Sequence, residues 1–174
     1  MKKNIIVATL VAAAAMTTVS AFAADGQIKF TGSVIDAACN VTNATSGSLD
    51  VGLGKVSKTA FTDAGDKTAA TKFTLQVSGC PVGVNSVNVK FDGKTVAGDN
   101  SVLALTQDAG VATGVGIQLS DASQTVLPLN TSSTNYALTS GAANLDFVAR
   151  YIATAKDVTS GPANAVANFS IVYN

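Results

Sequence analysis

The chain has 174 residues, and its 11 Lys and Arg balance 11 acidic residues, so the formal net charge is zero. It contains no His and no Trp, and every acidic residue is Asp. Without a basic excess or the usual acid–base residues, the composition excludes a nucleic-acid-binding protein and argues against an enzyme. We therefore expect no catalytic residue, no metal site, no cofactor and no nucleic acid partner.

Residues 1–23 have the organisation of a secretory signal peptide. Two lysines precede an apolar run over residues 5–16, and Ala-Phe-Ala at 21–23 has the small-x-small pattern of a cleavage site. The run is shorter than the roughly 20 residues that a membrane-spanning helix needs. We place the cut after Ala23, with a cut after Ala21 as the alternative. The mature chain is then exported and is not membrane-embedded.

Short alternating stretches of apolar and polar residues, separated by Gly, Asn, Asp and Ser, predict β-strands along the mature chain. These stretches are residues 28–34, 49–53, 73–77, 87–91, 115–119, 125–127, 145–152 and 166–173. Helical signal is weak and limited to residues 67–72, and residues 141–144 are predicted as a loop. The pattern indicates one all-β domain, a sandwich of two sheets.

Cys39 and Cys80 are the two cysteines of the chain. In an exported protein an even pair indicates one disulfide, with two buried free thiols as the alternative. Since no C-x-x-C spacing occurs, neither a zinc site nor a redox motif is indicated.

The last predicted strand places Ala167, Phe169, Ile171 and Tyr173 on one face. A strand this apolar belongs inside a sheet, yet it runs almost to the final residue. We therefore expect its neighbour on one side to come from elsewhere.

At the start of the mature chain, Gly26, Ile28, Phe30 and Gly32 share one face of an extended segment. Composition alone would allow this segment to be an ordinary first strand. The combination with the C-terminal pattern favours a different interpretation.

Together these features resemble the major-subunit type of the type 1-like chaperone–usher fimbrial pilins. The resemblance covers the whole chain. Near the N-terminus it is carried by the alternating Gly26, Ile28, Phe30 and Gly32 and by Cys39, with Cys80 about 40 residues later. Near the C-terminus it is carried by Gly161, fourteenth from the end, and by the penultimate Tyr173.

The resemblance implies an incomplete immunoglobulin-like β-sandwich over residues 33–174 that lacks its C-terminal strand. It implies completion by donor-strand complementation, in which residues 24–32 of a neighbour fill a groove. The donor residues would be Gly26, Ile28, Phe30 and Gly32, with Ile28 and Phe30 inserting their side chains and Gly26 opposite a blocked part of the groove. The groove strand, which also contacts the chaperone, would contain Gly161, Ala167, Phe169, Ile171 and Tyr173.

The implied partners are other copies of the chain and related pilins, a periplasmic chaperone and an outer-membrane usher. The implied function is that of a structural subunit of a bacterial surface fimbria that supports cell adhesion. The chain would pass through the periplasm to the cell surface and end in the extracellular fimbrium. The alternatives are a minor or adhesive fimbrial subunit and a self-sufficient periplasmic binding sandwich.

Overall fold

The computed structural model describes residues 26–35 and 38–174, which belong to two units, Met1–Val34 and Ile35–Asn174. The signal peptide prediction lies outside the described residues. In the first unit, residues 26–34 form neither helix nor strand, and Ile28 and Phe30 are 81% and 89% exposed. The strand predicted over 28–34 is therefore wrong for the single chain, because an extended segment needs partners for its N–H and C=O groups.

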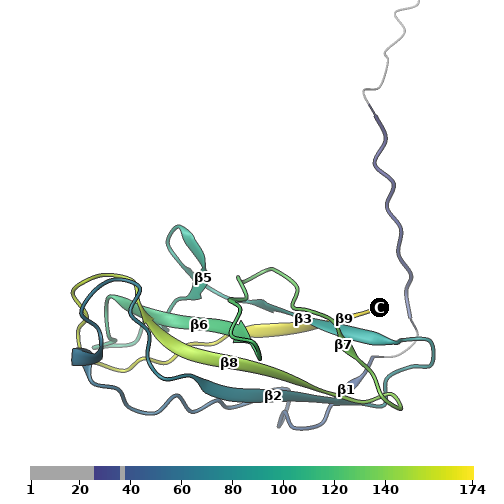
Figure 1. Cartoon of the computed structure of the whole chain (residues 1–174), viewed down its shortest axis with the longest axis horizontal. Helices are drawn as coiled ribbons and strands as arrows, with labels where there is room; N and C mark the ends of the chain where they lie inside the picture. Colours follow the sequence, from purple (N-terminus) through teal and green to yellow (C-terminus); the bar gives the residue numbers. More distant parts are fainter. Residues whose placement is uncertain (1–25, 36–37) are drawn as a thin grey trace, which may run out of the picture. The chain divides into compact units, whose positions relative to one another are not determined.

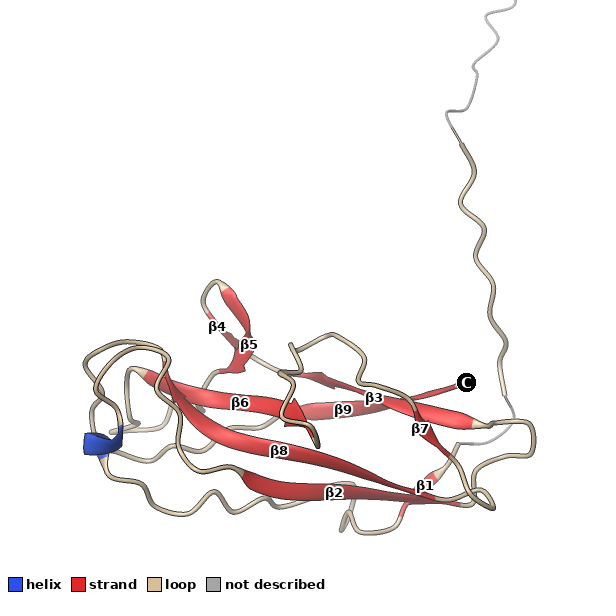
Figure 2. Ribbon diagram, in the orientation of Figure 1, coloured by secondary structure: helices blue, strands red, loops and turns tan. Residues whose placement is uncertain are grey.

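The second unit is built from two antiparallel sheets (Figures 1 and 2). The six-stranded sheet has the order β1 (Asn40–Val41), β2 (Thr71–Ser78), β8 (Ala143–Ala153), β6 (Val115–Asp121), β5 (Asp99–Leu103) and β4 (Thr95–Val96). The three-stranded sheet has the order β7 (Tyr136–Ala137), β3 (Ser86–Asp92) and β9 (Asn168–Tyr173). The all-β prediction is confirmed.

The helical content of the described residues is one short 3₁₀ turn, η1 (Lys58–Ala60). None of the helices in the described part of the chain is long and apolar enough to cross a membrane.

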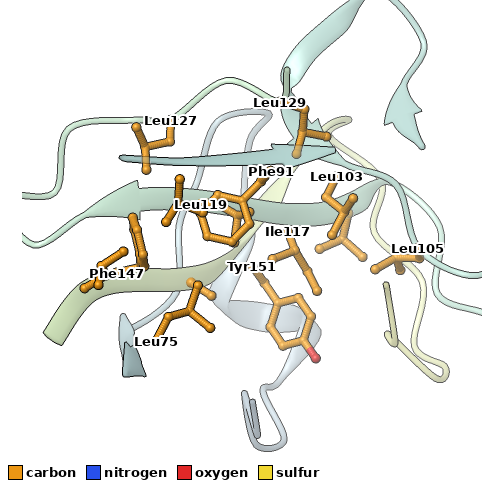
Figure 3. Packing of buried hydrophobic residues seen from close by; sticks show 14 of the residues in the cluster. Leu75, Phe91, Leu103, Leu105, Ile117, Leu119, Leu127, Leu129, Phe147 and Tyr151 are labelled. Carbon is orange, nitrogen blue, oxygen red and sulfur yellow. The ribbon is translucent and has the colours of Figure 1, made fainter. Parts of the chain in front are cut away.

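The core lies between the two sheets and follows from alternation within the strands. Successive side chains of a strand point to opposite faces, so every second residue of β3 and β8 enters the core. At the centre Phe147, fully buried, packs edge-on against Phe91 with ring centroids 5.0 Å apart. Phe73 and Tyr136 complete this aromatic cluster at 5.6 and 5.7 Å from Phe147 (Figure 3 shows the surrounding core).

Five of the predicted strands form, with shifted ends: 73–77, 87–91, 115–119, 145–152 and 166–173 correspond to β2, β3, β6, β8 and β9. Residues 125–127 make only an isolated bridge, from Val126 to Ser120, and residues 49–53 pair with no described strand. No helix forms over 67–72, since Lys67 bridges to Ile152 and β2 begins at Thr71. The loop predicted over 141–144 ends early, because β8 begins at Ala143.

The disulfide prediction is confirmed. Cys39 and Cys80 are bonded, with their Cα atoms 4.2 Å apart and 41 positions apart in sequence. Cys39 is buried and immediately precedes β1, and Cys80 comes two residues after the end of β2. The bridge therefore connects the start of the edge strand β1 to the end of β2, its neighbour in the six-stranded sheet.

Candidate functional site

The candidate site begins with β9, which pairs with β3 on one side only within the described residues. Asn174 and Ser86 exchange backbone hydrogen bonds of 2.9 and 3.2 Å. In an antiparallel ladder such pairs alternate along the strand, so residues 168, 170 and 172 also turn their backbone groups to β3. Phe169, Ile171 and Tyr173 consequently present their N–H and C=O groups to the opposite, open side.

Beside this open edge lies a cavity of about 520 Å³, the first cavity. Its floor consists of core side chains from both sheets: Phe73, Leu75, Phe91, Ile117, Leu119 and Ala149. One wall is formed by residues 165–169, which lead into β9, and the other by residues 47–53. An apolar floor that reaches the surface between two walls is the geometry of a sandwich that lacks one strand.

The wall opposite β9 is extended but unpaired. Leu49, Val51 and Leu53 are half-buried and face the first cavity, whereas Asp50 and Gly52 are exposed. The side chains of this segment therefore alternate between the cavity and solvent, as the sequence pattern predicted. Residues 49–56 nevertheless make no backbone hydrogen bond to any other part of the described chain. Both walls thus have backbone groups available to a strand lying between them.

A second cavity of about 560 Å³ continues the groove away from β9. It lies between residues 54–58 and residues 158–164, with Tyr151 and Phe61 among the residues lining it. The two walls therefore run in opposite directions along both cavities. We call the two cavities together the groove.

The wall at residues 158–164 is fastened from its outer side. Ala112 N donates to Pro162 O at 2.9 Å, and Thr106 N donates to Asn164 O at 2.8 Å. A side chain at Gly161 would meet the backbone of residues 110–112, with Ala112 N only 2.7 Å from the added Cβ. Only glycine fits at this point of the wall.

We therefore expect Gly161→Ala to lower the free energy of unfolding by about 1–3 kcal/mol, the usual cost of forcing an extra carbon into a packed site. The matched control is Gly52→Ala on the opposite wall, where an added Cβ meets nothing within 4 Å. Urea denaturation of both variants measures the difference. Equal stability of the two variants would show that the contact at residue 161 relaxes without cost.

Tyr151 lies at the boundary between the two cavities. Ala149, two residues earlier on β8, forms floor of the first cavity, and Tyr151 forms floor of the second. The Tyr151 hydroxyl donates a 3.1 Å hydrogen bond to Ala163 O on the groove wall (Figure 3 shows its ring within the core). Burial raises the pKa of the Tyr151 hydroxyl, which favours the protonated form that donates this bond.

Tyr136 makes an equivalent link at a different place. Its hydroxyl donates to Asp146 O at 2.8 Å and so connects β7 of the small sheet to β8 of the large one. Burial is the main cause of its raised pKa, and the charges of Asp121 and Asp146 add to it. Tyr136 does not line the groove.

The structure brings most of the predicted groove residues together. Gly161 lines the second cavity, Ala167 and Phe169 line the first, and Ile171 and Tyr173 continue the same half-buried face of β9. Gly26, Ile28, Phe30 and Gly32 belong to the first unit and are exposed there. Sequence reasoning missed the opposite wall and Tyr151. The alternation at residues 49–53 was a signal for the wall, but a tyrosine within a strand gives none.

Comparison with known proteins gives consistent results at three levels. A family model described as fimbrial protein matches residues 28–174. The long polar fimbria protein A of Salmonella typhimurium is 38% identical over 165 residues, covering 92% of each chain. The crystal structure of an antigen and type I fimbria protein of Burkholderia pseudomallei is 36% identical, with a TM-score of 0.59, and the match covers 85% of this chain and 97% of that one.

The crystal structure of the P pilus rod subunit PapA matches 79% of this chain and 100% of its own, with a TM-score of 0.65. Its identity of 22% supports a statement about the fold alone. The fold prediction of an incomplete immunoglobulin-like sandwich is confirmed.

Proposed function

Because this chain belongs to the fimbrial protein family and is a structural fimbrial subunit rather than an enzyme, we propose that it polymerises by strand donation. In this proposal residues 24–32 of one copy, continued by Val34, occupy the groove of the next copy. The observation that carries it is the groove itself, which has an apolar floor and two walls with available backbone groups. An exposed apolar segment of the same chain supplies the occupant.

The energetics support such an occupant. Burying Ile28 and Phe30 would contribute about 1.5–3 kcal/mol each. Each new backbone hydrogen bond to the open edge of β9 adds roughly 0.5–1.5 kcal/mol net. The sum is comparable to the roughly 5–15 kcal/mol that stabilises a whole domain. One strand can therefore complete the fold and hold the fibre together.

The shape of the groove favours one register. Gly32 is the donor residue with apolar side chains two positions away on both sides, Phe30 and Val34. We place Gly32, instead of Gly26, over Tyr151 and opposite Ala163, because glycine brings no side chain against the hydroxyl bridge. Phe30 then enters the first cavity and Val34 the second.

The lengths of the donor and of the groove wall also set the direction of the donor strand. The donor arm before Gly32 is the longer one, and the groove wall is longer on the β9 side of Ala163. The donor therefore runs antiparallel to β9, with Phe30 opposite Ala165 and Ile28 opposite Ala167.

Before assembly the open edge has to be covered, because unpaired strand edges and exposed apolar floors lead to aggregation. We propose that a periplasmic chaperone lends a strand to β9 and that an outer-membrane usher receives the subunit from it. The subunit then joins a surface fimbria outside the cell and supports adhesion there.

The test compares two exported variants by thermal unfolding. The first contains residues 33–174 without the donor segment. The second carries residues 24–34 after Asn174 through a four-residue turn of Asp, Asn and Gly, which can join only antiparallel neighbours. We expect the first to aggregate or melt easily and the second to be a stable monomer. If both are soluble monomers that melt alike, the sandwich is already complete and strand donation is wrong.

A further inference from the structure

The bond between Tyr151 and Ala163 occupies a carbonyl that an incoming strand would otherwise use. The neighbouring wall residues Pro162 and Asn164 direct their carbonyls outward, to Ala112 N and Thr106 N. In an extended wall the carbonyl between them faces the opposite way, toward the groove. That carbonyl is Ala163 O, and it already accepts from the Tyr151 hydroxyl at 3.1 Å.

Tyr151 is held firmly in this position. Its backbone N donates to Thr68 Oγ1 at 3.2 Å, and its backbone O accepts from Thr68 N at 3.1 Å. The side chain is only 8% exposed, so its ring has little freedom to leave the core. No described backbone or side-chain donor bonds to the carbonyls of Ala165 and Ala167, which lie on the same side of the wall toward β9. Among the described residues, the carbonyl of Ala163 is therefore already hydrogen-bonded, whereas those of Ala165 and Ala167 are open to a new strand.

We propose that Tyr151 is a positioning residue that ends the hydrogen-bond ladder between donor strand and groove at Ala165. This inference rests on the proposed function. The inward-facing donor residues up to Phe30 pair with the wall, whereas the amide of Gly32, opposite Ala163, meets a carbonyl that the Tyr151 hydroxyl already bonds from the groove side. The hydroxyl thus fixes where strand pairing stops and keeps the donor from pairing one step too far.

The test is residue-resolved hydrogen–deuterium exchange on fibres assembled from the full chain. In wild-type fibres we expect slow exchange at the amides of Ile28 and Phe30 and fast exchange at Gly32. Tyr151→Phe keeps the ring and removes the hydroxyl, so the Gly32 amide should gain Ala163 O and exchange at least tenfold more slowly. Tyr136→Phe is the matched control, because it removes the other cross-sheet hydroxyl and should leave Gly32 exchanging fast.

The outcomes are distinguishable. Slow exchange at Gly32 in wild-type fibres, or equally fast exchange in wild-type and Tyr151→Phe fibres, would overturn the role of Tyr151. The wild-type measurement decides this even if Tyr151→Phe does not assemble. Fast exchange at Ile28 and Phe30 as well would instead overturn strand donation itself.

Discussion

Replacing Phe30 by Asp is expected to abolish fibre assembly while leaving the subunit fold intact. The variant loses the roughly 1.5–3 kcal/mol from burying the ring, and it would place a carboxylate without a counter-charge in the first cavity, at a cost of several kcal/mol. At about 1.4 kcal/mol for each factor of ten, the loss in affinity between donor and groove exceeds a thousandfold. Electron microscopy of cells expressing the variant measures the number of surface fibres.

The matched control is Lys29→Asp, one residue away on the opposite face of the donor. It introduces the same carboxylate at a position that the proposed register leaves in solvent. Its fibres should match the wild type in number and length. Normal fibres from Phe30→Asp would show that the first cavity does not bind the donor. Loss of fibres from both variants would show that assembly does not depend on which face of the donor segment carries the carboxylate.

Removing the disulfide by the double substitution Cys39→Ala and Cys80→Ala is expected to lower the free energy of unfolding by about 4 kcal/mol. The bridge spans 41 positions of sequence, and closing a loop of this length restricts the unfolded chain by about that amount in the chain-entropy model. Urea denaturation of the mature chain with the donor segment appended after Asn174 measures the change on a monomer.

Reduction of the wild-type form of that monomer is the control. It breaks the same covalent bond but keeps both sulfur atoms. It therefore separates the effect of losing the bond on stability from the effect of removing the buried Cys39 side chain. Both treatments should lower the stability by similar amounts. A loss below 1 kcal/mol in both would mean that the unfolded chain is already restricted without the bridge.

The sheets were predictable where alternation and burial coincide. Residues 73–77 alternate strictly and residues 145–152 alternate in part, and both became interior strands whose apolar face meets the core. Residues 49–53 alternate equally well and line the groove instead, unpaired. Alternation reports which side chains are buried, whereas hydrogen-bonded pairing depends on a neighbouring strand, and no residue within 49–53 indicates whether one is present.

Other parts of the fold and of the site could not be predicted from the sequence, for different reasons. The hairpin of β4 and β5 is short, and two residues of Thr95–Val96 carry no measurable period. The contact of Tyr151 with Ala163 joins residues from β8 and the groove wall, and only the register of the sandwich brings them together. Gly161 was identified by its distance from the C-terminus, but its reason, the backbone of residues 110–112, is a tertiary contact.

The position of the disulfide also determines how a pulled fibre would carry tension. In the proposed fibre, force enters a subunit through its donor segment and reaches Cys39 five residues after Val34. The bond to Cys80 passes the load directly to the connection that leads into β3, and β3 is hydrogen-bonded along β9 beside the groove. The residues between the two cysteines therefore carry no tension. At about 3.3 Å per residue, roughly 130 Å of chain cannot be pulled out while the bridge is intact. The bridge thus acts as a tether that keeps each link of the filament short and stiff under shear.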